Sequence, residues 1–225
     1  MSKILIVPDV HGRAFWHRAL ELVDQVDQIV FLGDYLDPYS HEGISFAVAF
    51  EEFARILKFK KDNPNKVTLL VGNHDMHYII KDFMDCSRRN TAMLDQLHEL
   101  YNSNLDLFDL IHIEDDWMFS HAGVYKGWME KYEFTLEDLN LKTFLGSHWP
   151  ALEDLSMYRG GYNFVGSCVW ADIRESVKNE LFPGYKQVVG HTQLNDKPII
   201  MGSIMCVDVR RCFILDTITG QLENA

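Results

Sequence analysis

The chain has 225 residues, of which 47% are hydrophobic and 24% charged, and its formal net charge is -12 at pH 7. This length supports one sizeable hydrophobic core, and we predict a single domain over residues 1–225. The acidic balance argues against binding to nucleic acid or to an anionic membrane, because both depend on a surplus of Lys and Arg. We expect neither partner.

Cysteine usage and the spread of apolar residues indicate a cytoplasmic protein. The cysteines form no CxxC motif and lie scattered at Cys86, Cys168, Cys206 and Cys212. The first apolar run, residues 4–7, ends too early for a secretory signal. No apolar run approaches the roughly 20 residues that cross a bilayer.

The first half of the chain alternates apolar runs with amphipathic stretches. Strands are predicted at residues 4–7, 29–32 and 67–71, and helices at 14–25 and 44–59, where apolar residues recur at helical spacing. This β-α-β-α-β order implies parallel strands joined by right-handed crossover helices.

The second half has a different character. A helix is predicted at 93–101, and residues 145–166 are predicted to form a long ordered loop near the site, because they show no clear period. Short strands separated by Gly or polar turns are predicted at 110–113, 117–119, 187–189, 199–201, 204–207 and 212–215. These strands favour a second sheet that is mixed or antiparallel.

Short polar motifs stand where five of the predicted strands end. They are Asp9-Val10-His11, Gly33-Asp34-Tyr35-Leu36-Asp37, Gly72-Asn73-His74-Asp75, Ser120-His121-Ala122-Gly123 and Gly190-His191-Thr192. Carboxylate, imidazole and amide oxygen suit Mn²⁺, Fe or Zn²⁺, and no thiolate appears among them. Since active sites of sheet proteins collect at strand ends, the motifs together predict a two-metal phosphoesterase site.

The motifs divide into two sets of metal ligands. Asp9 and His11 are separated by Val10, so both would point from the end of a strand towards one ion. Asp34 would bridge the ions, because two cations about 3.5–4 Å apart need a shared negative ligand. The second ion's shell would be completed by Asn73, His121 and His191.

His74 is the residue of these motifs that remains for proton transfer. A hydroxide between the metals would attack phosphorus in line, and His74 would protonate the leaving oxygen. Asp37 is the candidate partner that orients His74 and favours its protonated form. Taken singly, an Asp before Pro38 is equally a turn former, and a lone His is commonly a satisfied polar group. Ligand types at five strand ends are harder to explain by turn chemistry alone.

On these motifs the chain resembles the calcineurin-like metallophosphoesterases, and among them the PPP family of serine/threonine phosphatases. Residues 8–12 are similar to the family's GDxHG, 33–39 to GDYVDRG and 72–75 to GNHE. Its later histidine motifs and WSD segment are similar to residues 120–123, 189–193 and 170–172. The likeness runs from Asp9 to about Gly220.

The resemblance implies an α/β fold with four layers, α-β-β-α, in which two mixed sheets are flanked by helices. It also implies the same ligand assignment, with Asp37 and His74 as the acid pair. The implied activity is that of a serine/threonine protein phosphatase, which hydrolyses phosphomonoesters. The implied partner is a phosphorylated substrate, either a phosphoprotein or a small phosphoester. Two divalent metal ions are the implied cofactors, with Mn favoured over Fe or Zn.

One position departs from the family pattern. The arginine of GDYVDRG, which grips phosphate in the family, is Pro38 here and cannot supply a guanidinium. We predict that Arg159, before Gly160-Gly161 in the long loop, takes over this role, with Arg13 as second choice. An ordinary surface arginine is the alternative for Arg159.

Two other functions remain open. The motif at residues 72–77, with His77 at its end, also resembles symmetrical diadenosine tetraphosphatases, although His77 could instead pack on the following helix. Asp37 favours the protein phosphatase, because the tetraphosphatases typically lack an acid there. The rival class is a non-catalytic scaffold with an inherited metal cage, which has no need of an intact Asp37 and His74 pair.

Overall fold

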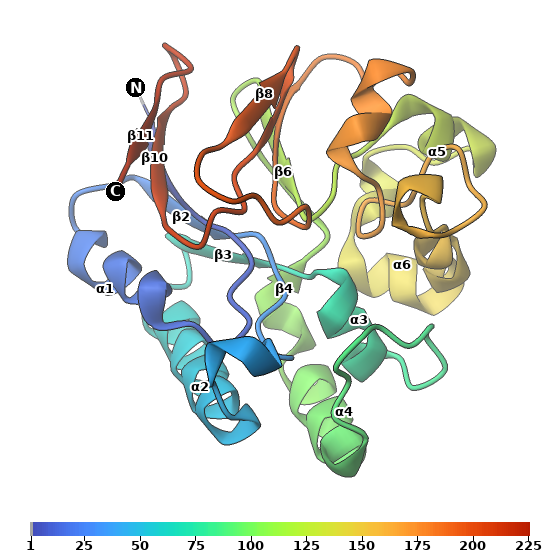
Figure 1. Cartoon of the computed structure of the whole chain (residues 1–225). Coiled ribbons are helices and arrows are strands. Elements are labelled where there is room, and N and C mark those ends of the chain that lie inside the picture. Colours follow the sequence, from blue (N-terminus) through green and yellow to red (C-terminus); the bar gives the residue numbers. More distant parts are fainter. Residues whose placement is uncertain (1) are drawn as a thin grey trace. The chain divides into compact units, whose positions relative to one another are not determined.

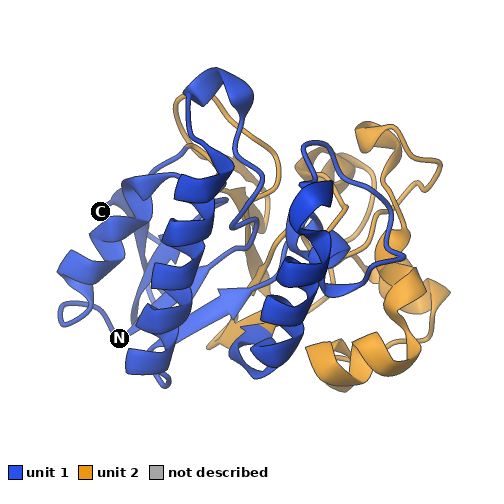
Figure 2. Ribbon diagram, turned by 90° about the horizontal axis from the view of Figure 1, so that it is seen from below, with its two compact units in different colours: residues 1–108, 210–225 blue, residues 109–209 orange. Residues whose placement is uncertain are grey.

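The computed structural model describes residues 2–225, and Figure 1 follows the chain from one end to the other. The chain divides into two compact units, coloured separately in Figure 2. Unit 1 comprises residues 1–108 and 210–225, and unit 2 comprises residues 109–209. That residues 1–225 act as a single domain stays a prediction.

Unit 1 is built on a six-stranded mixed sheet of order β11-β10-β1-β2-β3-β4. The strands are β1 (Lys3–Val7), β2 (Gln28–Phe31), β3 (Val67–Leu70), β4 (Phe108–Asp109), β10 (Phe213–Asp216) and β11 (Leu222–Asn224). β1, β2 and β3 are parallel, as predicted, with Leu5 opposite Ile29 and Val30 opposite Thr68. β10 pairs antiparallel with β1, which makes the sheet mixed.

The helices of unit 1 are α1 (Arg18–Leu22), α2 (Phe46–Asp62), α3 (Asn73–Ile79) and α4 (Leu94–Ser103). Short 3-10 helices lie at Ala14–His17, Ser40–Glu42, Thr91–Met93 and Leu105–Leu107. Ser45 begins α2, where its Oγ accepts a hydrogen bond from Val48 N–H at 3.2 Å. Figures 1 and 2 both show α1, α2 and α4 on the same side of this sheet.

Helix α3 begins inside the third polar motif and was absent from the sequence prediction. All seven of its residues are buried, four of them polar, so polar and apolar residues do not separate into an exposed and a buried face whose period could reveal the helix. Asp75 secures its first turn, since Oδ2 accepts a hydrogen bond from Gly72 N–H at 2.7 Å.

Unit 2 contains a five-stranded mixed sheet of order β5-β6-β7-β9-β8. Its strands are β5 (Ile111–Glu114), β6 (Trp117–Ser120), β7 (Lys186–Val189), β8 (Ile199–Met201) and β9 (Ile204–Cys206). β6, β7 and β9 are parallel, while β5 and β8 are antiparallel to their neighbours. The helices are α5 (Lys126–Lys131) and α6 (Leu141–Ser147), with 3-10 helices at Glu137–Leu139, Trp149–Glu153, Met157–Arg159 and Ile173–Val177.

The segment 145–166, predicted as a loop, begins inside α6 and contains two of these 3-10 helices. Backbone bonds order it, for example from Gly161 N–H to Ser156 O at 2.9 Å. A Cβ on Gly161 would collide with the carbonyl oxygen of Leu155, so this turn requires glycine.

Three features of the fold bear on the sequence expectations. Two mixed sheets flanked by helices are present, which confirms the predicted fold class. All four cysteines are buried free thiols. Among residues 2–225, no helix combines the length and apolarity that crossing a membrane requires.

Candidate metal centre and proton donor

The first three polar motifs meet at the carboxyl ends of β1, β2 and β3. His11 N–H donates to Asp34 O at 2.7 Å, and Gly12 N–H donates to Tyr35 O at 3.0 Å. Asp75, from the third motif, accepts from the N–H groups of Asp34 and Tyr35 at 2.7 and 3.2 Å. Three loops that are distant in sequence therefore form one bonded assembly within unit 1.

Glycine permits this close approach at one position in particular. Gly33 has φ 102°, and a Cβ there would collide with the backbone of Gly72. The backbones of the second and third motifs can therefore approach this closely only because position 33 is glycine.

Four predicted site residues have left-handed backbone conformations that favour glycine. Their φ angles are 45° for His11, 54° for Asp34, 59° for Asp37 and 60° for His191. Such conformations cost on the order of 1–3 kcal/mol each and persist where the surrounding structure fixes them. Each sharp turn follows a strand and sets the direction of a chemically active side chain.

Asp9 and Asp34 form a buried pair of carboxylates. Each residue is 2% exposed, and their side-chain oxygens lie within 4.8 Å of one another. Burial, followed by the negative charge of Asp9, raises the pKa of Asp34 well above its usual value. The pair thus concentrates negative charge that a bound cation would offset.

His11 presents one defined nitrogen to this pair. Its Nδ1 lies 2.7 Å from the carbonyl oxygen of Leu36, which can only accept, so Nδ1 carries the proton. Its Nε2 therefore carries the lone pair, 3.5 Å from Asp34 Oδ2. Burial, followed by the charge of His74, lowers the pKa of His11, which favours the neutral form that binds metals.

Asn73 brings an amide to the same assembly from the first residue of α3. It is 2% exposed, and its Nδ2 donates to Cys86 Sγ at 3.3 Å. The neighbouring residue is tied to the second motif, because His74 N–H donates to Asp34 Oδ1 at 2.9 Å.

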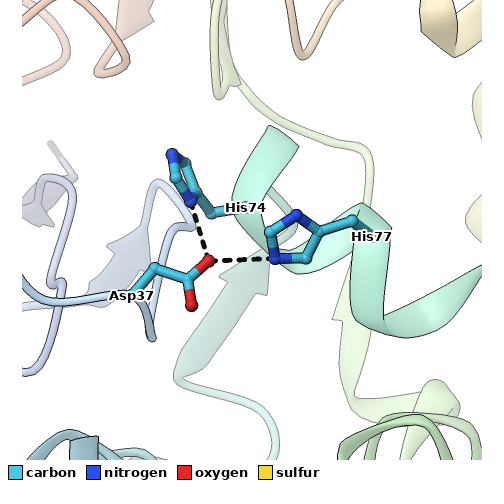
Figure 3. A group of neighbouring side chains, drawn as sticks. All are labelled: Asp37, His74 and His77. Atoms are coloured by element: carbon cyan, nitrogen blue, oxygen red, sulfur yellow. Dashed lines mark hydrogen bonds and ion pairs between the residues drawn. The ribbon is translucent and has the colours of Figure 1, made fainter. Parts of the chain in front are cut away.

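Asp37 and His74 lie against each other, and His77 contacts the same carboxylate oxygen (Figure 3). Asp37 Oδ2 is 2.8 Å from His74 Nδ1 and 2.9 Å from His77 Nε2, and Oδ1 accepts from the Tyr78 hydroxyl. These three could also be metal ligands, since their ligand-type atoms lie within 4.8 Å of one another. Because both oxygens of Asp37 face donors, the geometry suits proton transfer better.

The pKa directions agree with an ionised Asp37. Burial alone would raise the pKa of Asp37, but hydrogen bonds from His74 and His77 hold it below its usual value. Burial lowers the pKa of His74, and Asp37 opposes this effect. The carboxylate therefore favours the proton on His74, while the ring still releases it readily.

A family model of calcineurin-like phosphoesterases matches residues 2–194 of the chain. The chain belongs to this family. It is therefore a metal-dependent phosphoester hydrolase, and enzymes of this family use a dinuclear metal centre. A search of curated proteins found no match.

Two solved structures are similar in fold to this metallophosphoesterase. One is a cold-active protein-tyrosine phosphatase of a psychrophilic Shewanella species, with 18% identity, a TM-score of 0.61, and coverage of 100% of this chain and 80% of that chain. The other is a protein serine/threonine phosphatase from Saccharomyces cerevisiae, with 16% identity, a TM-score of 0.52, and coverage of 100% and 80%. At these identities the likeness shows the fold alone.

The buried donors of unit 1 fit the metal centre of the family. Asp9 and Asp34 supply negative charge, His11 supplies a neutral nitrogen, and no sulfur stands among the predicted ligands. This donor set suits a divalent first-row metal or Mg²⁺-like ion. Burial of two adjacent carboxylates without a cation would be costly, so the metallophosphoesterase gains stability from one.

Unit 2 of the metallophosphoesterase brings together the other two predicted ligands. His121 directly follows β6 and His191 follows the neighbouring parallel strand β7. His121 Nε2 lies 3.0 Å from His191 Nδ1, and Gly190 N–H donates to His121 O at 2.9 Å. The two imidazoles thus face each other through these ring nitrogens.

Arg159 secures the turn that carries His191. Its NH2 group donates to His191 O at 2.8 Å and to Thr192 Oγ1 at 2.7 Å. Its Nε lies 2.9 Å from Asp172 Oδ2, and Arg174 lies 2.7 Å from the other oxygen of that buried carboxylate. The contacts describe a positioning role for Arg159, and its predicted phosphate contact stays a prediction.

Residues that the sequence left without a clear role join the proton donor in unit 1. His77 is fully buried against Asp37, and Tyr78 bonds the same carboxylate. Arg88 donates through Nε to Asp37 O at 2.9 Å. The only sequence signal for Arg88 is a basic pair, Arg88-Arg89, shortly after the third motif.

Proposed function

We propose that this metallophosphoesterase is a serine/threonine protein phosphatase that hydrolyses phosphomonoesters, with His74 as general acid. The observation that carries the proposal is the buried contact of 2.8 Å between His74 Nδ1 and Asp37 Oδ2. The proposed ligands of two divalent ions, with Mn favoured over Fe or Zn, are Asp9, His11, Asp34, Asn73, His121 and His191. Family membership and the donor chemistry of these residues support that assignment.

The metal pair, when bound, supplies Lewis acidity to the phosphoryl group. His74 gives a proton from Nε2 to the leaving oxygen, because its Nδ1 faces Asp37. Asp37 holds the ring in orientation and stabilises its protonated form. Tyr78 and His77 fix the carboxylate in turn, since both contact it from α3.

A dedicated acid favours an alkyl ester over an aryl ester. A serine or threonine alkoxide is a poor leaving group, because its conjugate acid is an alcohol about as weakly acidic as water. A tyrosine phenolate, with a pKa of about 10, leaves without much help. His74 thus supports phosphoserine and phosphothreonine as substrates.

A dinucleoside polyphosphate hydrolase is the second candidate, on the sequence likeness of residues 72–77. His77, which suggested that relative in the sequence, lies 2.9 Å from Asp37. Since the tetraphosphatases typically lack an acid at the position of Asp37, this contact does not favour them. A nucleotide leaving group carries its own negative charge and needs less protonation, so Asp37 and His74 still favour the monoester.

The test is turnover by chelator-stripped, Mn²⁺-reloaded protein on three substrates: a phosphoserine peptide, a phosphotyrosine peptide and diadenosine tetraphosphate. The phosphotyrosine arm is included because one structural neighbour is named a protein-tyrosine phosphatase. We expect the phosphoserine peptide to be preferred. His74→Asn should reduce its turnover more than that of the phosphotyrosine peptide, because the alkoxide depends more on the acid.

Other outcomes assign a different function. Preference for diadenosine tetraphosphate would select the second candidate. If His74→Asn lowered turnover of the phosphoserine and phosphotyrosine peptides by the same factor, His74 would not be the group that protonates the leaving oxygen. Metal-loaded protein that is inert on all three substrates would favour an untested phosphoester or the scaffold.

A further inference from the structure

We propose that Arg88 binds the substrate phosphate beside His74 and replaces the guanidinium that the family carries at the position of Pro38. This inference rests on the proposed hydrolysis of a phosphomonoester. It concerns the residue that holds the phosphoryl oxygens while His74 acts on the leaving oxygen.

The backbone around Arg88 is fixed by bonds to α3. Cys86 N–H donates to His77 Nδ1 at 3.3 Å, and Asn90 N–H donates to the Tyr78 hydroxyl at 2.8 Å. Arg89 adds a bond to His77 O at 2.9 Å. Arg88 itself has φ 69°, a left-handed conformation held by these neighbours. The turn thus presents one arginine in a set direction.

The guanidinium of Arg88 lies next to the proton donor. Its Nε donates to Asp37 O at 2.9 Å, and Asp37 directly precedes Pro38. Its plane centre lies 3.7 Å from the centroid of the Tyr39 ring. Its NH2 group is 3.4 Å from His74 Nε2, the atom proposed to face the leaving oxygen. An oxygen on the same phosphorus would lie within reach of this group.

The existing partners of Arg88 leave its charge available to an anion. Nε and NH1 donate to a carbonyl and a hydroxyl, Asp37 O and Ser87 Oγ, and both acceptors are neutral. The contact of NH2 with His74 is too long for a strong hydrogen bond. A phosphate oxygen would give NH2 a shorter, charge-assisted bond.

The two arginines named from the sequence differ in this respect. Arg13 donates to both oxygens of Glu42, at 2.9 and 3.1 Å, so a carboxylate already neutralises it. Arg159 is paired with the buried Asp172 at 2.9 Å. Of these three guanidinium groups, the one of Arg88 combines neutral partners with proximity to His74.

The experiment compares Mn²⁺-loaded wild type with Arg88→Ala, Arg88→Lys and the control Arg55→Ala. Arg55 also lies over an aromatic ring in unit 1, at 5.7 Å from the centroid of Trp16, and it is not one of the predicted site residues. For each protein we would measure kcat and KM on the phosphoserine peptide and the inhibition constant of inorganic phosphate. We would also measure the metal content and the melting temperature of each protein.

We expect Arg88→Ala to raise KM and the phosphate inhibition constant by at least about ten-fold, because a charge-assisted contact is lost. The KM and the phosphate inhibition constant of Arg88→Lys should lie between those of wild type and Arg88→Ala, since lysine keeps the charge but not the planar fork of arginine. Millimolar guanidinium ion should restore part of the Arg88→Ala activity. Arg55→Ala should match wild type, and metal content should be equal in all four proteins.

Two results would overturn the inference about Arg88, and a third would reject the proposed function on which it rests. KM and phosphate inhibition within two-fold of wild type in Arg88→Ala would show that the residue does not touch phosphate. Loss of bound metal or of melting temperature in both Arg88 variants would show a structural role. Wild type that hydrolyses no phosphopeptide would instead reject the proposed function. This outcome differs from a wild type that is active and an Arg88→Ala variant that is unchanged, which would reject only the role of Arg88.

Discussion

The two units present their candidate site residues in different ways. In unit 1 the residues follow parallel strands, and the loops that carry them are joined by backbone hydrogen bonds such as His11 N–H to Asp34 O. In unit 2, His191 stands on a turn held by side chains, chiefly Arg159 and the buried Asp172. In unit 1, backbone bonds at the carboxyl ends of the strands order the acidic donors. In unit 2, an ion pair orders the turn that carries the imidazole of His191.

The chemistry of the two sets differs as well. Unit 1 holds buried carboxylates and a histidine braced by Asp37, so it contains negative charge and a proton donor. Unit 2 contributes His121 and His191, which are neutral ligands when they bind metal. This difference predicts that changes at the proton donor in unit 1 act first on turnover, and changes at the ion pairs of Asp172 in unit 2 act first on stability.

The largest expected effect is on turnover in unit 1. His74→Asn should lower kcat on the phosphoserine peptide by about 10²–10⁴-fold, the usual contribution of a general acid. Metal content should stay at the wild-type level, because His74 is not a proposed ligand. Steady-state kinetics with metal analysis checks this, and a variant with unchanged kcat would remove His74 from the mechanism.

The sequence was most informative about this part of unit 1. β1, β2 and β3 each lie within one residue of the predicted strands, because buried parallel strands are short apolar runs bounded by polar motifs. Asp9, Asp34 and Asn73 could be selected from their place at strand ends alone. Their left-handed turns could not be foreseen, since they arise from bonds between loops.

Sequence patterns said much less about residues that act through long-range packing. Arg88 reaches Asp37 across 51 positions of the sequence, and no periodicity encodes that contact. Helices α5 and α6 are too short for a clear apolar period and were missed. Arg159 was selected for its loop, while its bond to His191 O depends on the folding of two distant segments.

The next effect concerns stability in unit 2. Asp172→Ala should lower the free energy of unfolding by about 3 kcal/mol, because it leaves Arg159 and Arg174 without their buried carboxylate. The matched control is Asp116→Ala, whose pair with Lys186 is solvent-exposed and worth less than about 1 kcal/mol. Urea unfolding monitored by circular dichroism measures both.

Acid should reduce the difference between Asp172→Ala and wild type. Burial alone would raise the pKa of Asp172, but Arg174 and Arg159 hold it below its usual value of 3.8. A depressed carboxyl pKa contributes stability above the unfolded value, and this contribution is lost as the pH falls through the folded value. The two proteins should therefore begin to converge as the pH falls below about 3.8 and meet only below the lower pKa of folded Asp172. A difference that is constant with pH would show that the ion pair is not its source.

A smaller effect on turnover is expected at Asp37. Asp37→Asn should lower kcat by about 10–10²-fold, because the ring of His74 keeps its place less well. The alkaline limb of the kcat profile should also move to lower pH. Burial already lowers the pKa of His74 and Asp37 opposes it, so removal of the carboxylate lowers the pKa further. A profile that stays in place would show that the proton comes from another group.

The smallest effect is expected at Glu175, a buried carboxyl of unit 2. Its oxygens accept from Gly166 N–H and Asp172 N–H at 3.1 Å, and burial raises its pKa from 4.5 to about 6. A raised pKa contributes stability below pH 4.5 that is lost as the pH rises through 6. Relative to Glu175→Gln, wild type should therefore lose up to about 2 kcal/mol over this range.

Urea unfolding at pH 4.5, 5.5 and 6.5 measures this loss. The control is Glu180→Gln, an exposed position paired with Lys126, which should follow the wild-type profile through this range. Parallel profiles for wild type and Glu175→Gln would mean that Glu175 is ionised at little cost. The bonds from Gly166 and Asp172 would then outweigh burial, unlike at Asp75 in unit 1, where burial raises the pKa despite bonds from backbone N–H groups.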